Sequence, residues 1–244
     1  MNLAIDLGNT SAQAAFFEGN SLKKYYPKIT LEGVENSVQN QGITHIVLSD
    51  VGKKSQPWIK TLQKYAPVLV LDYQTPLPIQ NTYQTPQTLG NDRLAAVVGA
   101  NFLYPNQNNL IADIGTCVTY DFITDQKVYL GGNISAGLQM RLEALPHFTA
   151  QLPRVNFDPN QDYDQNQGMG WSTDSAILYG AVQGLSLELE GMIRRYKQRF
   201  RKFNIIFCGG NAVFFDTKIK ESIFVNQKLV LVGLNCILDF VKKQ

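Results

Sequence analysis

The sequence predicts an α/β fold in which one small unit occurs twice. Segments with the pattern of buried strands alternate with segments of helical periodicity, most clearly over residues 43–71. A short apolar strand that runs into Asp-x-Gly and then into a second strand occurs at residue 6 and again at residue 113. A further strand ends at Gly209-Gly210. The doubled strand, turn and strand unit is therefore the feature that any functional assignment must explain.

The other elements follow in order along the chain. The first half is predicted to contain strands at 2–5, 12–17, 43–48 and 68–71 and helices at 55–65 and 92–103. The second half is predicted to contain strands at 110–112 and 204–207, a strand that ends at 123, and helices at 138–145, 173–200 and 230–241. Two polar loops, 73–91 and 154–170, interrupt this pattern. The first exceeds the ~12 to 15 residues usual for a loop without a function, so we expect it to bind a ligand or to be mobile.

Length and composition are those of an ordinary folded chain. The 244 residues allow one large domain or two small ones, and 44% hydrophobic with 11% aromatic residues excludes a disordered or fibrous protein. The 22 basic and 20 acidic residues leave a net charge of +2. Because no broad basic field results, we expect no nucleic-acid partner.

The N-terminus and the cysteines predict a cytoplasmic protein without a membrane partner. Residues 1–6 do not combine a basic segment with an apolar run, so no secretory signal is expected. No apolar stretch approaches the ~20 residues that cross a bilayer. Cys117, Cys208 and Cys236 are odd in number and far apart, which argues against a disulfide framework and against a thiolate zinc site.

The long helix predicted at 173–200 carries three glycines on or near an apolar face. Gly180, Gly184 and Gly191 each cost helix stability of about 1 kcal/mol relative to alanine. We expect this cost to be offset by close packing, with a second subunit as one candidate neighbour.

The doubled unit has the chemistry of a phosphate site. Glycine lets the backbone approach an anion closely, and residues 9–11 and Thr116 supply hydroxyl, amide and backbone N–H donors. A carboxylate at each strand end can hold a cation or its waters. Either copy alone is also a good turn sequence. Two copies at equivalent places favour nucleotide binding.

These motifs resemble those of a known superfamily. Segments 6–10, 113–116 and 208–210 are similar to the two phosphate motifs and the adenosine motif of the acetate and sugar kinase, actin and heat-shock ATPase superfamily. Within it, Gly90-Asn91-Asp92-Arg93, Gly131-Gly132-Asn133-Ile134, residues 149–153 and the short length resemble type III pantothenate kinase. Two departures occur: Ala136 stands where the family usually has Pro, and Trp171 where a basic residue is common.

The resemblance implies a role for each matching residue. The implied ATP contacts are Asp6, Leu7, Gly8, Asn9, Thr10, Ser11, Ala12, Gln13 and Thr116. The implied substrate contacts are Tyr83, Gly90, Asn91, Asp92, Arg93 and Thr173. Asp92 would be the catalytic base, Asp113 would hold a monovalent cation (K⁺ or NH₄⁺), and Asp6 would hold Mg²⁺ through water.

Four of these residues also have an ordinary structural interpretation. Asp92 could cap the helix that follows, and either Ser172 or Thr173 could cap the long helix at 173–200. Tyr83 could anchor its loop, and Arg93 could form a surface salt bridge. A cation in the first turn of a helix is opposed by the helix dipole, however, and a bidentate guanidinium suits capture of a carboxylate such as that of pantothenate.

The resemblance therefore implies an α/β, two-lobe actin-like ATPase (ribonuclease H-like) fold with duplicated mixed-sheet domains. ATP would lie in the cleft between lobes 1–108 and 109–244. The implied activity is phosphorylation of pantothenate by Mg²⁺-ATP to 4'-phosphopantothenate, the first step of coenzyme A biosynthesis, in a homodimer with the active site near its interface. Two alternatives are a sugar or acetate kinase of the same fold, disfavoured by the short chain, and a non-catalytic nucleotide-responsive regulator, which would not need Asp92.

Overall fold

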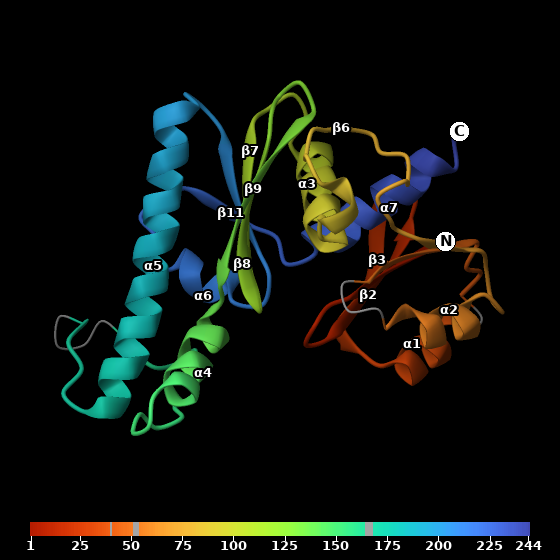
Figure 1. Ribbon diagram of the computed structural model, residues 1–244. Helices are drawn as coiled ribbons and strands as arrows, with labels where there is room; N and C mark the ends of the chain where they lie inside the picture. The colour runs from red at the N-terminus through yellow and green to blue at the C-terminus, as the bar shows by residue number, and fades with distance from the viewer. Residues whose placement is uncertain (40, 51–53, 164–167) are drawn as a thin grey trace. The chain divides into compact units, whose positions relative to one another are not determined.

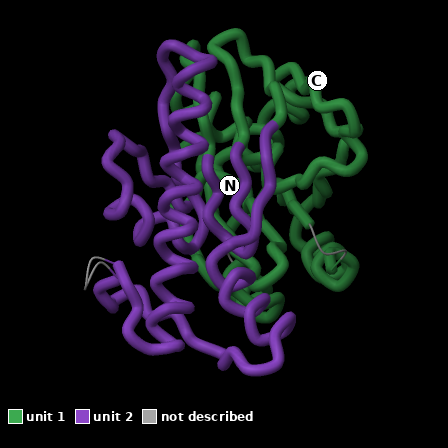
Figure 2. Tube along the Cα trace, turned by 60° about the vertical axis from the view of Figure 1, so that its left-hand side comes forward, with its two compact units in different colours: residues 1–111, 121–131, 228–244 green, residues 112–120, 132–227 purple. Residues whose placement is uncertain are grey.

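The chain consists of two compact units. The computed structural model describes residues 1–39, 41–50, 54–163 and 168–244. Unit 1 contains residues 1–111, 121–131 and 228–244, and unit 2 contains residues 112–120 and 132–227 (Figure 2). By its contacts, the C-terminal segment 228–244 belongs to unit 1. The division predicted from the sequence instead gives two continuous lobes, 1–108 and 109–244. That division into lobes stays a prediction.

A five-stranded sheet of order β3-β2-β1-β4-β5 organises unit 1 (Figure 1). Its strands are β1 (Asn2–Leu7), β2 (Ala12–Glu18), β3 (Ser21–Ile29), β4 (His45–Asp50) and β5 (Val68–Val70). β1 is buried along its whole length and is parallel to β4, which is parallel to β5. The carboxyl ends of these three strands therefore lie at one edge of the sheet.

Two short helices complete the apolar core of this sheet. They are α1 (Leu31–Val38) and α2 (Ser55–Leu62), and their buried members Val34, Val38 and Leu62 pack with Leu3, Ile5, Phe16 and Leu48. The sequence predicted neither β3 nor α1. β3 has no buried residue and so lacks the apolar run that identified its neighbours, and α1 is only two turns long.

Two longer helices of unit 1 pack through a pair of glycines. α3 (Asn91–Leu103) and α7 (Leu229–Val241) approach so closely that a Cβ on Gly99 would collide with the Leu229 carbonyl oxygen. A Cβ on Gly233 would collide with the Ala95 carbonyl oxygen in the same way. The C-terminal helix is thereby held in unit 1, next to the helix that carries Asp92.

A six-stranded sheet has the order β11-β10-β7-β8-β9-β6. Its strands are β6 (Gln80–Asn81), β7 (Asn109–Ile114), β8 (Cys117–Ile123), β9 (Val128–Ala136), β10 (Asn204–Cys208) and β11 (Ile223–Val225), and η1 (Pro86–Thr88) is a single turn in the loop after β6. β7 and β8 confirm the second strand, turn and strand unit. β9 includes Gly131-Gly132, where the sequence predicted no strand. Gly131 has a φ of 91°, a conformation that glycine adopts readily and other residues rarely adopt.

Unit 2 adds α4 (Leu138–Phe148), α5 (Thr173–Arg199) and the single-turn α6 (Ala212–Asp216). Ser172 is the N-cap of α5 and forms a capping box with Ser175, so Thr173 is not the cap. Within the described residues, no atom lies within 4 Å of a Cβ built on Gly180 or Gly191, so the expected close packing at these glycines does not occur inside the chain. The predicted polar loop 154–170 includes residues 164–167, which lie outside the described residues. In the described part of the chain, no helix is both long and apolar enough to span a membrane.

Candidate active site

The predicted first phosphate loop lies between β1 and β2 of unit 1. It spans Gly8–Ser11, with Asn9 and Thr10 exposed, and it follows the buried Asp6. A Cβ on Gly8 would lie 3.0 Å from the Ser11 carbonyl oxygen, so glycine permits the tight turn. Lys54 Nζ donates to the Asn9 carbonyl oxygen at 3.2 Å. The loop thus presents exposed polar groups at the carboxyl end of a buried strand, beside a lysine.

The predicted second phosphate loop, residues 115–116 of unit 2, lies between β7 and β8 and is enclosed by two glycines. The Gly137 N–H donates to the Thr116 carbonyl oxygen at 3.1 Å, and a Cβ on Gly137 would collide with that oxygen. Gly209, at a φ of 87°, lies against Ile114 and Asp113. This contact explains why the strand that ends in Gly209-Gly210 accompanies the second Asp-x-Gly: any side chain at 209 would occupy the place of the Asp113 carboxylate.

Two glycines border the Asp113 carboxylate. Its Oδ1 lies between Gly115 and Gly209: a Cβ on Gly115 would lie 3.4 Å from it, and one on Gly209 would collide with it. The carboxylate is half-buried, and Asp113 is a residue of β7, whose other residues are buried. Hard cations prefer oxygen ligands of this kind. The residues present at Asp113 therefore fit a cation.

The Gly90–Arg93 block reaches the same sheet edge as the first phosphate loop. Asn91 Nδ2 donates to the Leu71 carbonyl oxygen, directly after β5, at 2.8 Å. β5 lies two strands from β1 in the sheet, and strands are spaced by about 4.8 Å, so roughly 10 Å of sheet separates the two features. Unit 1 therefore brings the predicted ATP loop and the predicted substrate block to one edge.

Asp92 lies in the first turn of α3, but it is not the N-cap. The N-cap is Gly90, and a Cβ there would lie 2.5 Å from Asp92 Oδ1, so the absence of a side chain makes room for the carboxylate. Asp92 Oδ1 accepts the Arg93 N–H at 2.8 Å. Burial raises the pKa of the Asp92 carboxyl above its ordinary value, and the nearby Asp121 carboxylate adds to this increase. A half-buried carboxyl with a raised pKa is suited to accept a proton.

Arg93 is buried and paired with Asp121, so the surface salt bridge considered for it is wrong. The side chains of Arg93 and Asp121 are 5% and 1% exposed. Arg93 Nη2 donates to Asp121 Oδ1 at 2.7 Å, and Nε lies 3.2 and 3.1 Å from the two carboxylate oxygens. Burial opposes the charged guanidinium, but the hydrogen bonds and charge of Asp121 outweigh it and raise the pKa of Arg93. Arg93 therefore stays charged beside Asp92.

Tyr83 connects its loop to this cluster. Its ring stacks on that of Tyr129, with centroids 6.2 Å apart and an interplanar angle of 5°, and lies 5.6 Å from Arg93 Cζ. A Cβ on Gly131 would lie 3.3 Å from the Tyr83 ring. Tyr83 is thus an anchor of its loop, and it is also half-buried next to the proposed substrate-binding arginine.

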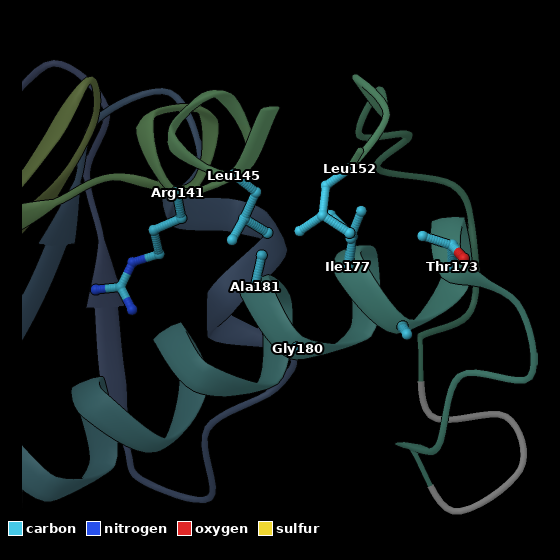
Figure 3. A pocket seen from close by; sticks show the side chains of 8 residues that line it. Arg141, Leu145, Leu152, Thr173, Ile177, Gly180 and Ala181 are labelled. Atoms are coloured by element: carbon cyan, nitrogen blue, oxygen red, sulfur yellow. The ribbon is translucent and has the colours of Figure 1, made fainter. Parts of the chain in front are cut away.

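Thr173 lies in a pocket of about 550 Å³ between α4 and α5 of unit 2. Figure 3 shows Thr173 at one end of this pocket and Arg141 at the other, with Leu145, Leu152 and Ile177 between them. The pocket is therefore mainly apolar, with one hydroxyl at its edge. The predicted site residues divide between the units: residues 6–13, 83 and 90–93 belong to unit 1, and residues 113, 116 and 173 to unit 2.

Sequence reasoning did not select Asp121, Tyr129 or Gly137. For Asp121 a signal exists, because a carboxylate next to Phe122 and Ile123 in a strand must find a partner when it is buried. For Gly137 and Tyr129 we find no such local signal, since their contacts depend on elements distant in the sequence.

Comparison with known sequences gives a consistent result over most of the chain. A family model described as type III pantothenate kinase matches residues 2–195. The chain is 42% identical over 248 residues to the type III pantothenate kinase of Christiangramia forsetii, with 100% of both chains covered.

Comparison with solved structures agrees on the fold. A conserved protein from Campylobacter jejuni, described as a proposed Baf family transcriptional activator, matches with a TM-score of 0.64 and 20% identity, over 99% of this chain and 100% of that one. An inorganic polyphosphate/ATP-glucomannokinase from Arthrobacter sp. strain KM matches with a TM-score of 0.50 and 14% identity, over 99% and 98%. The predicted α/β, actin-like ATPase fold is confirmed.

Proposed function

Since the chain belongs to the type III pantothenate kinase family, we propose that its two phosphate loops and Asp92 carry out ATP-dependent phosphorylation of pantothenate. This kinase reaction forms 4'-phosphopantothenate, the first step of coenzyme A biosynthesis. The observation that supports the site most directly is the buried cluster in which Asp92, with a raised pKa, adjoins a charged Arg93.

Asp92 is the base in this proposal. It accepts the proton of the primary hydroxyl of pantothenate as that oxygen attacks the γ-phosphorus of ATP, and ADP leaves. Catalysis of phosphoryl transfer depends largely on positioning the reactants and on stabilising the charge of the phosphoryl group. The proton therefore moves to Asp92 late in the reaction. Arg93 binds the pantothenate carboxylate, Tyr83 and residues 90–91 line the substrate position, and Thr173 contributes a hydroxyl.

The loops hold the nucleotide. Backbone N–H groups and side chains of residues 6–13, together with Thr116, bind the phosphates. Glycine has no side chain, so the backbone N–H groups beside it can come close to an anion. Asp6 would hold Mg²⁺ through water, and Asp113 would hold K⁺ or NH₄⁺. These cations, when bound, neutralise charge on the phosphate oxygens.

We also propose that the protein acts as a cytoplasmic homodimer through α5. Gly180 and Gly191 have open space beside them, and Leu187 is 68% exposed on the same helix. A second copy would cover this apolar face and place Thr173 near an active site. The three free cysteines fit a reducing compartment. Sedimentation equilibrium at micromolar concentration tests the dimer, and a monomeric mass would contradict it.

Release of ADP from Mg²⁺-ATP, with and without pantothenate and in potassium or sodium buffer, tests the function. Asp92→Asn should lower pantothenate-dependent turnover by about 10²-fold or more, within the range usual for acid-base groups, while ATP binding persists. Asp158→Asn is the matched control, because Asp158 Oδ1 also accepts a backbone N–H, that of Asn160 at 2.9 Å, in an exposed turn. Unchanged turnover in Asp92→Asn would contradict the base assignment, and equal turnover in both buffers would contradict the cation site.

A further inference from the structure

The Arg93 guanidinium is fixed in its plane by a residue that comes 28 positions later in the sequence. Asp121 contacts it through Nε and Nη2, which form one edge of the guanidinium. A bidentate pair of this kind defines both the direction and the rotation of the group. A single carboxylate contact would leave the rotation free.

Asp121 is itself held by Tyr129. The Tyr129 hydroxyl donates to Asp121 Oδ1 at 2.6 Å, and the Tyr129 ring is fully buried. Burial and the charge of Asp121 both raise the pKa of Tyr129, so its hydroxyl keeps the proton that it donates. β8 and β9 are neighbouring strands of the sheet, which keeps the two side chains in place.

Three hydrogen bonds connect Tyr129, in the sheet, to Asp92, in the predicted substrate block. Tyr129 donates to Asp121, Asp121 accepts from Arg93, and the Arg93 N–H donates to Asp92. The Tyr83 ring stacks on Tyr129 and faces the guanidinium. Since every member belongs to unit 1, the arrangement does not depend on how the units are placed.

We propose that Asp121 and Tyr129 are positioning residues, which orient Arg93 so that the donors used by neither Asp121 nor Tyr83 receive the substrate carboxylate. This inference rests on the proposed function, in which Arg93 binds that carboxylate. In this proposal the Tyr129 hydroxyl affects substrate affinity indirectly, through Asp121 and Arg93. A guanidinium released from this clamp would have to be ordered again at each binding event, which weakens binding.

Unit 2 contains a matched control. The Tyr120 hydroxyl donates to Glu188 Oε1 at 2.8 Å, and Tyr120 is also almost fully buried. Glu188 in turn pairs with Arg141, to which the proposed function assigns no role. Tyr120→Phe and Tyr129→Phe therefore each remove one hydrogen bond from a buried tyrosine to an arginine-paired carboxylate. Only the second acts on Arg93.

The experiment measures KM for pantothenate, KM for ATP and kcat in wild type and both variants, with urea unfolding to confirm that each variant is folded. Tyr129→Phe should raise KM for pantothenate about fivefold, which corresponds to one typical hydrogen bond, and should change kcat and KM for ATP less than about twofold. Tyr120→Phe should leave all three within about twofold. In an Arg93→Lys background, Tyr129→Phe should add no further increase, because the effect passes through the guanidinium.

Several outcomes would overturn the inference. They are a Tyr129→Phe variant with the KM of wild type, an equal increase in both variants, and a full additional increase in the Arg93→Lys background. A wild-type protein with no pantothenate-dependent ADP release would instead refute the proposed function, and this inference with it. The two failures are thus distinguishable from the wild-type measurement alone.

Discussion

Each unit contains one cluster of an arginine, a carboxylate and a buried tyrosine, and the two clusters differ in burial. In unit 1, Arg93 and Asp121 are 5% and 1% exposed, whereas in unit 2 Arg141 and Glu188 are 24% and 27% exposed. Tyr129 and Tyr120 complete the two clusters with similar hydrogen bonds. The same three residue types therefore occur once almost fully buried and once partly exposed to water.

The difference has consequences for what each cluster can do. A buried ion pair is costly to desolvate and is stable only with all partners present, so the first cluster has one arrangement. Glu188 is shared by Tyr120, Ser135 and Arg141, and its pKa is lowered: burial raises it, but the hydrogen bonds from Ser135 and Arg141 lower it more. The second cluster thus joins α4, α5 and the sheet, and water can replace any one partner.

The largest expected difference between the clusters is in stability. Asp121→Ala should reduce the free energy of unfolding by about 3 to 5 kcal/mol, because it leaves the Arg93 charge buried and unpaired. Glu188→Ala should cost only about 1 to 2 kcal/mol, since Arg141 can be hydrated and the main loss is the partner of the Tyr120 hydroxyl. Urea unfolding of both variants measures this difference. Equal losses would show that burial does not distinguish the two clusters.

A smaller effect is expected in the pH dependence of activity. Asp92 acts as a base only when ionised, and its pKa is raised, so kcat/KM should be lost as pH falls through a value above that of an ordinary aspartate, about 3.9. Asp121→Asn removes a nearby negative charge, which should move this acid limb to lower pH. Glu188→Gln should leave the limb in place. A pH profile of kcat/KM for the three proteins tests this, and a shift in Glu188→Gln alone would reverse the assignment.

The smallest effect is expected from salt. Partly exposed charges are screened by ions, whereas buried pairs are screened much less. Raising sodium chloride from about 0.05 to 1 M should shrink the stability lost in Glu188→Gln and should leave the loss in Asp121→Asn nearly unchanged. Urea unfolding at both concentrations provides the measurement. The contrary result, a salt-sensitive loss only in Asp121→Asn, would indicate that water reaches the first cluster.

Much of the candidate site follows from local sequence. The two Asp-x-Gly turns lie where the apolar strands before them end, and α3 begins at Asn91, within one residue of its prediction. These features depend on residues that are close together in the chain, so their periodicity and turn residues can be recognised in the sequence alone. Edge strand β3 and the extension of β9 through Gly131-Gly132 were missed, because polar edge residues and glycines give no apolar alternation.

Local sequence was enough to identify the chemical groups of the candidate site: two carboxylates at strand ends, glycines beside them, and a carboxylate followed by a guanidinium at the start of one helix. Their partners depended on the folded chain. It paired Arg93 with Asp121 instead of solvent, placed Gly137 and Gly209 against the second phosphate loop, and grouped the C-terminal helix with unit 1. Local propensity acts over a few residues, whereas desolvation of a charge and close backbone contact depend on segments far apart in the chain.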